Sequence, residues 1–430
     1  MKRFISMLLA TVMLFGLAAC SQPIKMTGVD LVAVPVYPKG IDFEDLDKQR
    51  ELRENNPVNE NTINAVNQFS YNTAAHILKG SSDTNDCYSP LSLYYALALA
   101  AAGAEGPTRD ELLTLLGVED VASLSEQCGN LYRLLYTDNK ISRLKIANSL
   151  WLANKMDEQQ NSFKDNYIKN ATEHFYTSLF TADFADENSG KAMGRWVSEN
   201  TNGTFTPEFK TNAEQIMSIL NTVYFYDQWI DRFNTKNTKK DTFYLESGQE
   251  VVGDFMNMNY GSHGFSRGDG YTRSSLGLKE SGSMIFILPD EGVAVADLLS
   301  SPQKLKEIFM QGEDKNGKVV WSVPKFKYGS SFDLVDTLKA LGVTSAFSLD
   351  SADFSGLTDA PAFISGVKQE THISIDENGV EASAFTSIDY AGAAPPEDEA
   401  EMILNRPFIY GITASNGALL FVGICMNPAS

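Results

Sequence analysis

The sequence predicts an α+β fold in which helices dominate the first half of the chain and strands dominate the second. In the first half, apolar residues recur three and four positions apart, which is the period of a helix with one buried face. In the second half, apolar segments are short and rich in β-branched and aromatic residues, as strands are. This segregation indicates α+β rather than regular βαβ alternation. With 430 residues, 43% of them apolar, the chain can bury a large core.

The chain begins with a secretory signal. A basic start at Lys2 and Arg3 precedes an apolar run over 4–19, and Cys20 follows directly. The ending Leu-Ala-Ala-Cys resembles the bacterial lipobox, in which the cysteine is lipidated and becomes the first mature residue; the alternative is a plain secretion signal. We expect 1–19 to be a signal peptide and the protein to be exported and lipid-anchored through Cys20 to the bacterial envelope, at the outer membrane. No other segment is long and apolar enough to span a membrane.

Residues 20–57 carry charges and prolines with little periodicity, so we expect a flexible, lipid-anchored tether there and a single domain over 58–430. Without Lys2 and Arg3 the formal charge of −20 becomes −22. An acidic surface repels phosphate backbones and sulfated chains. We therefore expect no nucleic-acid partner and no heparin-type polyanion.

Three helices are expected early in the chain. The first covers 61–80, where apolar residues follow the helical period. Ser89-Pro90 supplies an N-cap and a first-turn proline for 91–102, which is apolar nearly all round and should be a buried helix. A capping-box spacing starts the third helix at 108, and Gly117 ends it.

Later segments are predicted as strands, with one further helix over 332–341 ended by Gly342. Ser415-Asn416-Gly417 is a turn signal between the last two strands, which suits a hairpin. The expected strands are 144–152, 219–226, 284–288, 321–326, 408–413 and 419–425.

No arrangement of residues for enzyme catalysis is found. Gly264-Phe265-Ser266-Arg267-Gly268 matches the G-x-S-x-G motif, but its polar, glycine-rich flanks predict a surface turn rather than a strand and a helix. An esterase using Ser266 is a third, minor hypothesis. Lys315-Asn316-Gly317-Lys318 is predicted as a hairpin turn, because it lacks the spacing of a phosphate loop.

No metal site or cofactor is expected either. The remaining cysteines, Cys87, Cys128 and Cys425, are odd in number and are best interpreted as buried, inert thiols. The histidines are scattered without metal-ligand spacing; they are His76, His174, His263 and His372.

The stretch 377–396 has features of both a buried strand and an exposed loop. Small or apolar residues occupy alternate positions and polar residues the others, interrupted only by Phe385. The alternating set is Val380, Ala382, Ala384, Thr386, Ile388 and Tyr390. Yet Gly392, Pro395, Pro396 and the acidic residues that follow disfavour regular structure. The segment is therefore predicted to adopt two conformations.

A series of short motifs runs along 57–430 and covers nearly the whole domain. They are Ser89-Pro90-Leu91-Ser92-Leu93, Gly103-Ala104-Glu105-Gly106-Pro107-Thr108, Asn148-Ser149-Leu150-Trp151, Trp196-Val197, 221–229, Pro324-Lys325-Phe326, Leu341-Gly342, Asp353-Phe354-Ser355-Gly356, Arg406-Pro407-Phe408, Leu420-Phe421-Val422-Gly423 and Asn427-Pro428. Each match is short, but in this order of motifs the chain resembles the serpin family.

The resemblance implies a fold of three β-sheets with a large central sheet, eight to nine helices, an exposed reactive-centre loop over about 377–401 and a metastable native state. It implies a monomeric suicide-substrate inhibitor of serine endopeptidases, with papain-like cysteine endopeptidases as a further class. The cleaved loop inserts into the central sheet with the protease still attached. The hinge would be Glu377, Gly379, Val380, Glu381, Ala382, Ser383 and Ala384. The alternative is a non-inhibitory serpin acting as a binding or scaffold lipoprotein.

The family's loop length places the reactive bond at Ala393-Ala394, sixteen residues after Glu377. Counting back from Arg406 instead leads to Pro396, a poor cleavage site. Small residues suit elastase-like or subtilisin-like targets, while Tyr390 is an alternative for a chymotrypsin-like one.

Two residues depart from the family pattern. Gln369 stands where serpins usually carry a histidine beneath the central sheet, near the positions of Ser92 and Asn221. Because its amide both donates and accepts, we expect the polar network to survive. Phe385 replaces a typical alanine, and we expect it to slow loop insertion.

Overall fold

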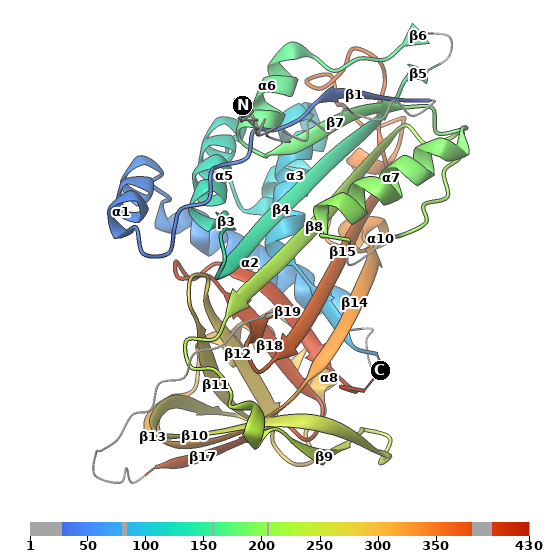
Figure 1. Ribbon diagram of the computed structural model, residues 1–430. Helices are drawn as coiled ribbons and strands as arrows, with labels where there is room; N and C mark the ends of the chain where they lie inside the picture. The colour runs from blue at the N-terminus through green and yellow to red at the C-terminus, as the bar shows by residue number, and fades with distance from the viewer. Residues whose placement is uncertain (1–27, 80–83, 157–158, 204–205, 381–397, 430) are drawn as a thin grey trace, which may run out of the picture.

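The computed structural model of the 430-residue chain describes residues 28–79, 84–156, 159–203, 206–380 and 398–429. The strands form two large sheets and a two-stranded ribbon, and most of the helices lie in the upper half of the view (Figure 1). The predicted α+β class with a large central sheet is confirmed. The described part contains ten α-helices rather than eight or nine. They are α1 Leu46–Asn55, α2 Glu60–Leu78, α3 Pro90–Gly103, α4 Gly106–Leu116, α5 Val121–Leu135, α6 Asp165–Glu173, α7 Glu187–Asn200, α8 Val295–Leu298, α9 Pro302–Met310 and α10 Val335–Ala340.

The central sheet has the strand order β1-β7-β4-β8-β16-β15-β14, with the short β3 paired to β4. Its strands are β1 Val29–Ala33, β3 Thr137–Asp138, β4 Ser142–Ala153, β7 Thr177–Ala182, β8 Met217–Gln228, β14 Phe326–Asp333, β15 Ile364–Asp376 and β16 Gly379–Val380.

The second sheet has the order β17-β13-β10-β11-β12-β18-β19-β2, with β9 paired to β10. Its strands are β2 Asp86–Tyr88, β9 Lys239–Tyr244, β10 Glu250–Gly268, β11 Tyr271–Leu278, β12 Gly282–Pro289, β13 Glu313–Pro324, β17 Glu399–Ile403, β18 Phe408–Thr413 and β19 Leu419–Cys425. The ribbon pairs β5 Lys155–Met156 with β6 Gln159–Gln160.

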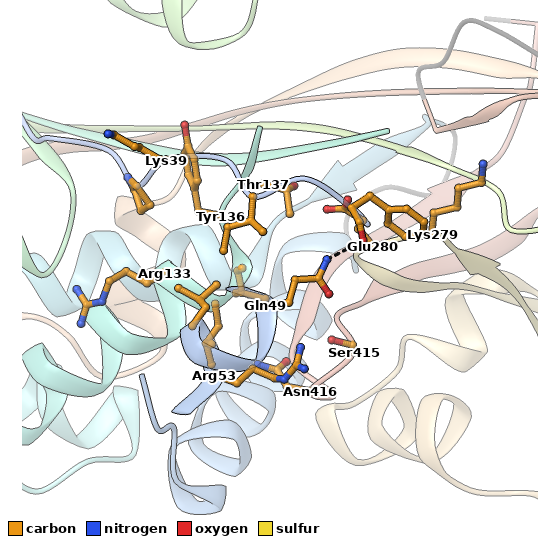
Figure 2. A pocket seen from close by; sticks show the side chains of 16 residues that line it. Lys39, Gln49, Arg53, Arg133, Tyr136, Thr137, Lys279, Glu280, Ser415 and Asn416 are labelled. Atoms are coloured by element: carbon orange, nitrogen blue, oxygen red, sulfur yellow. Dashed lines mark hydrogen bonds between the residues drawn. The ribbon is translucent and has the colours of Figure 1, made fainter. Parts of the chain in front are cut away.

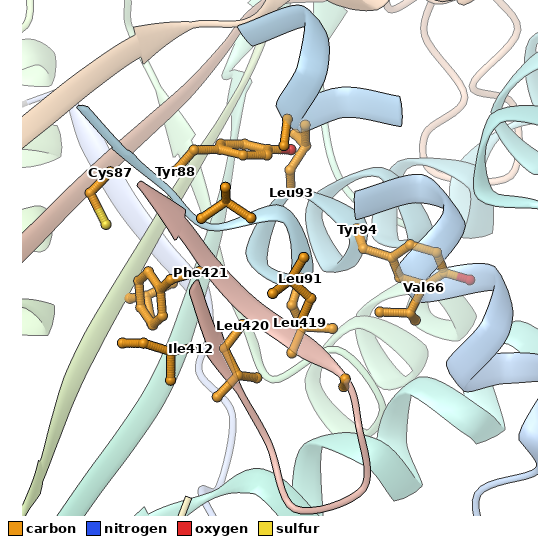
Figure 3. Close-up of a cluster of buried hydrophobic side chains, with 14 of the residues drawn as sticks. Val66, Cys87, Tyr88, Leu91, Leu93, Tyr94, Ile412, Leu419, Leu420 and Phe421 are labelled. Carbon is orange, nitrogen blue, oxygen red and sulfur yellow. The ribbon is translucent and has the colours of Figure 1, made fainter. Parts of the chain in front are cut away.

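Helix α3 is buried beneath the central sheet, as its apolar sequence predicts. Pro90 occupies its first turn, where the missing N–H costs nothing. Figure 3 shows its side chains Leu91 and Leu93 in the cluster that joins α3 to β19 and β2. Helix α7 covers the opposite face, where Trp196 packs with Leu220 of β8. The central sheet is therefore enclosed by helices on both faces.

Two predicted turns are strands in the structure. The G-x-S-x-G segment lies inside β10, and Lys315-Asn316-Gly317-Lys318 lies inside β13, because the two strands pair over these residues. Gly317 serves close backbone approach rather than turning, because a Cβ on it would lie 2.1 Å from the Asp398 carbonyl oxygen. The predicted strand 321–326 divides between β13 and β14, and the predicted helix 332–341 begins only at Val335.

The expectation of a flexible tether up to residue 57 is wrong for the described residues from 28 on. Strand β1 pairs with β7 at the edge of the central sheet, and helix α1 follows. Tyr37 then stacks against Tyr136 and Tyr176 and lies 4.2 Å from the Lys145 ammonium. Aromatic and cation–π contacts thus bind a stretch whose sequence shows little periodicity.

Within the described ranges, the helices include none with the length and apolar character needed to cross a membrane. The three cysteines found there are buried and unbridged, as predicted. Burial raises the pKa of the Cys87 thiol to about 12. These thiols therefore stay protonated near neutral pH.

Candidate functional site

The chain reverses direction at the end of β15 and returns as β16. Asp376 accepts hydrogen bonds from the Trp229 indole, through its carbonyl oxygen, and from the Asn378 N–H, through its carboxylate, at 2.9 and 2.7 Å. The Asn378 carbonyl oxygen accepts from the Trp229 N–H at 3.0 Å. The returning residues Gly379 and Val380 pair with β15 on one side and with β8 on the other. Gly379 and Val380 of the predicted hinge therefore already lie between two strands of the central sheet.

Glu377 is fixed at this reversal by an ion pair. Its side chain accepts hydrogen bonds from the Lys325 ammonium at 3.0 Å and from the Thr238 hydroxyl at 2.8 Å. Burial acts to raise the pKa of Glu377, but the hydrogen bonds from Thr238 and Lys325 outweigh it and leave the pKa below its ordinary value. The carboxylate is therefore ionised near neutral pH and holds the reversal between β15 and β16 in place.

Gly379 has no room for a side chain. A Cβ there would lie 2.1 Å from the Asp227 carbonyl oxygen and 2.7 Å from the Gln228 Cα. Val380 is 1% exposed and points to the core face, opposite Ile375. Glycine is needed because the strands are already packed against it.

Below the hinge, β8 and β15 pair directly with each other. Their parallel ladder runs from Met217 opposite Ile364 to Thr222 opposite Glu370. Residues 223–226 and 371–374 lie between this ladder and the pairs made by β16. Any strand that continued β16 would have to replace the direct ladder with its own hydrogen bonds.

The structure brings Gln369, Asn221 and Ser92 together under the sheet. The Gln369 amide donates to the Ser89 carbonyl oxygen at 2.8 Å and accepts from the Ser89 N–H at 3.0 Å. The Asn221 amide accepts from the Ser92 hydroxyl and donates to the Ser92 carbonyl oxygen. Gln369 thus uses both its donor and its acceptor inside the core.

Sequence reasoning missed two members of this network. Asn148 accepts a hydrogen bond from Asn221, and the backbone of Ser89 holds Gln369. Asn148 lies on the buried face of β4, between Ile146 and Leu150. A polar residue at an inward position of an apolar strand is the signal that could have found it.

Glu370 faces the other side of the same strand and was also missed. It is 4% exposed, accepts from the Ser331 hydroxyl at 2.8 Å, and leaves its Oε2 without a partner among the described residues. Burial raises its pKa to about 7, while Ser331 and Lys368 act in the opposite direction. A titratable carboxyl thus lies where the direct ladder between β8 and β15 ends.

Several predicted residues fall outside the described part of the chain. These are Cys20, the hinge residues Glu381, Ala382, Ser383 and Ala384, and Phe385, Tyr390, Ala393 and Ala394 of the loop.

Ser266 is not placed as a nucleophile. It is 5% exposed near the end of β10, donates to Asp314 and accepts from Arg273 at 2.9 Å. The ring of His263, three residues earlier, bonds instead to the Ser275 carbonyl oxygen. Ser266 thus contacts a carboxylate and a guanidinium but no histidine, whereas a serine hydrolase pairs its nucleophile with an imidazole base.

The described residues contain no cluster of side chains that could hold a metal ion. A cavity of about 230 Å³ lies between α1, the end of α5 and the turn at Ser415 and Asn416. Figure 2 shows Arg133 and Lys279 pointing away from its interior, so these charges do not converge on a ligand.

Comparison with known proteins agrees with this geometry. Residues 64–428 match the family profile Serpin (serine protease inhibitor). Serpin-ZX of Arabidopsis thaliana is 27% identical over 395 residues, covering 85% of this chain and 98% of the relative; Serpin B3 of Homo sapiens is 28% identical over 376 residues, covering 81% and 95%.

Among solved structures, the thermophilic serpin tengpin in its native state superposes with a TM-score of 0.74 at 28% identity, covering 92% of this chain and 97% of its own. Members of this family are generally protease inhibitors rather than enzymes. The chain belongs to the serpin family.

Proposed function

We propose that this protein is a suicide-substrate inhibitor of serine endopeptidases, with papain-like cysteine endopeptidases as a further class of target. The catalytic serine attacks a carbonyl carbon of the loop, the C–N bond breaks, and the new amine leaves with a proton. The loop remains as an ester on the protease. Its insertion between β8 and β15 traps this ester before water hydrolyses it.

One observation carries the proposal: Gly379 and Val380 already occupy the first positions between β8 and β15. Extending β16 by about fourteen residues, at roughly 3.3 Å each, would move an attached protease on the order of 45 Å. New ladder bonds and buried apolar surface make this worth on the order of 10 kcal/mol. The native form would then be kinetically trapped.

For the reactive bond we propose Ala393-Ala394, cut by an elastase-like or subtilisin-like target, with Tyr390 as the alternative for a chymotrypsin-like one. For its location we propose export and lipid anchoring through Cys20 to the bacterial envelope, at the outer membrane. We propose that the inhibitor acts as a monomer.

The test is to mix the protein with an elastase-like serine protease and analyse the products in SDS. A covalent band of the summed mass supports trapping, and mass spectrometry of the released fragment identifies the bond. A protease that turns over the loop without leaving such a band contradicts the proposal.

A non-inhibitory serpin is the second candidate, and one observation favours it. Five residues after Val380 comes Phe385, and five before Asp227 comes Thr222, so continued pairing would place Phe385 beside Thr222 and Glu370. Both partners are already buried. If this phenylalanine blocks insertion, cleavage leaves the melting temperature unchanged.

A further inference from the structure

The described chain enters the central sheet at the end opposite the hinge. Val29, the first residue of β1, pairs with Ala182, which pairs with Ala153 at the end of β4. Strand β8 begins at this same end with Met217, and the hinge pairs with its other end at Gln228. These two residues of β8 are eleven positions apart, or roughly 36 Å. Figure 1 shows β1 and β17, where the described chain resumes after the loop, at opposite ends of the molecule.

Loop insertion would end where β1 begins. Ten residues after Val380 comes Tyr390, and ten before Asp227 comes Met217, so unbroken pairing would set Tyr390 beside Met217. A protease bound at Ala393 would lie three residues further on. The inserted strand and β1 would be separated by β8, β4 and β7, which is four strand spacings, or roughly 19 Å.

The span between Cys20 and Gly28 is short compared with a protease. Only residues 21–27 separate them, so the two Cα atoms lie at most roughly 28 Å apart. A compact protease of about 200 residues has a diameter of roughly 40 Å. A captured protease at this end of the sheet is therefore wider than the gap that a membrane anchor on Cys20 allows.

We propose that the end of the central sheet where β1 begins faces the lipid bilayer, so that insertion drives the captured protease against the membrane and lowers the yield of inhibition by the anchored protein. The inference rests on the proposed loop insertion. The reason is kinetic: when steric resistance slows insertion, more of the acyl-enzyme is hydrolysed before it is trapped. The opposite end of the central sheet, where β16 pairs with Gln228, then faces away from the membrane, so that proteases reach the uncleaved loop without hindrance.

The experiment attaches the chain from Cys20 to Ser430 to phosphatidylcholine vesicles that carry a maleimide lipid. Cys20 is the reactive thiol, since Cys87, Cys128 and Cys425 are at most 1% exposed. We measure the moles of inhibitor consumed per mole of elastase-like protease inactivated. The attached protein is expected to need at least about three-fold more than the same protein in solution, because hydrolysis of the acyl-enzyme then competes with the slowed insertion.

A matched variant carries a 40-residue Gly/Ser spacer between residues 24 and 25, which adds roughly 35 Å of reach. Attached to vesicles, it should regain the consumption measured in solution, and in solution it should behave like the parent protein. Equal consumption by attached and free parent protein overturns the inference. Equal consumption is also expected if the molecule lies with its β1 edge against the membrane, since Val34 and Val36 beside that edge are 57% and 89% exposed.

A failure of the proposed function is recognised in solution, without vesicles. If the free protein forms no covalent band in solution, trapping itself is wrong, whatever the vesicles show. Chemical coupling makes the result independent of natural lipidation, which mass spectrometry of Cys20 from the native source tests separately.

Discussion

At the residue scale, the packing of β16 against β8 depends on the absence of a side chain at Gly379. Replacing it with alanine puts a Cβ 2.1 Å from the Asp227 carbonyl oxygen, so β16 must move away from β8. Overpacking of this kind costs about 1–3 kcal/mol. We expect Gly379→Ala to lower the unfolding temperature and to increase hydrogen exchange at the Val380 amide.

The matched control is Gly261→Ala, because a Cβ there meets no atom within 4 Å and the residue lies in β10. It should leave both measurements unchanged. If Gly379→Ala behaves like this control, the packing of β16 against β8 is looser than described.

Glu370 should make stability depend on pH. Its pKa is about 7 in the folded protein against an ordinary 4.5, so its proton stabilises the folded state below pH 4.5. This stabilisation is lost as the pH rises toward and through 7, and the free energy of unfolding then falls by up to about 3 kcal/mol. We expect Glu370→Gln to match the parent near pH 4.5 and to unfold at a higher temperature near pH 8.

Thermal unfolding of both proteins from pH 4.5 to 8 measures this difference. Titration of His174 and His372, whose pKa values are lowered by burial, occurs in both proteins and cancels. Parallel pH profiles for parent and variant would show that Glu370 ionises as freely as in water.

At the element scale, residues 28–55 are held against the rest of the molecule by Tyr37 rather than by a buried face of α1. Helix α1 contains no buried residue, whereas Tyr37 stacks on Tyr136 and Tyr176. We expect Tyr37→Ala to destabilise this attachment by about 2 kcal/mol and to increase hydrogen exchange along β1 and the facing amides of β7.

Val36→Ala is the control, since Val36 is 89% exposed. It should leave exchange along β1 as in the parent. Unchanged exchange in Tyr37→Ala would mean that the ladder between β1 and β7 holds without the aromatic cluster.

Elements with a strong local signal are predicted best. Helix α3 follows from Ser89-Pro90 and an apolar run, and the hairpin of β18 and β19 follows from its turn residues. Strand β10 is missed because its apolar alternation is confined to Met256, Met258 and Tyr260, while the glycines along its nineteen residues favour turns. Its partners β9, β11 and β13 hold it, and those pairings are not encoded in its own sequence.

At the scale of the whole molecule, the central prediction is that cleavage makes the protein more stable. Insertion of the loop would add a strand between β8 and β15 and replace their direct ladder with one ladder to each strand. We expect the loop-cleaved protein to melt tens of degrees above the intact one, because the gain on the order of 10 kcal/mol is large on the scale of domain stability.

Calorimetry of intact and cleaved protein checks this. Gly379→Ala, cleaved in the same way, tests whether the rise depends on the position of β16. An unchanged melting temperature after complete cleavage would identify a serpin that does not insert its loop.

The sequence by itself determined the class of fold, its family motifs, the buried helix α3 and the alternation of small residues that follows Glu377. These are local patterns, and local sequence carries them. Only the tertiary structure decided that the Ser89 backbone holds Gln369, that β16 lies between β8 and β15, that Glu370 is desolvated, and that β1 forms an edge of the sheet. Gln369 is 280 residues from Ser89 and 148 from Asn221 along the chain, and only strand register and packing bring residues so far apart in sequence into contact.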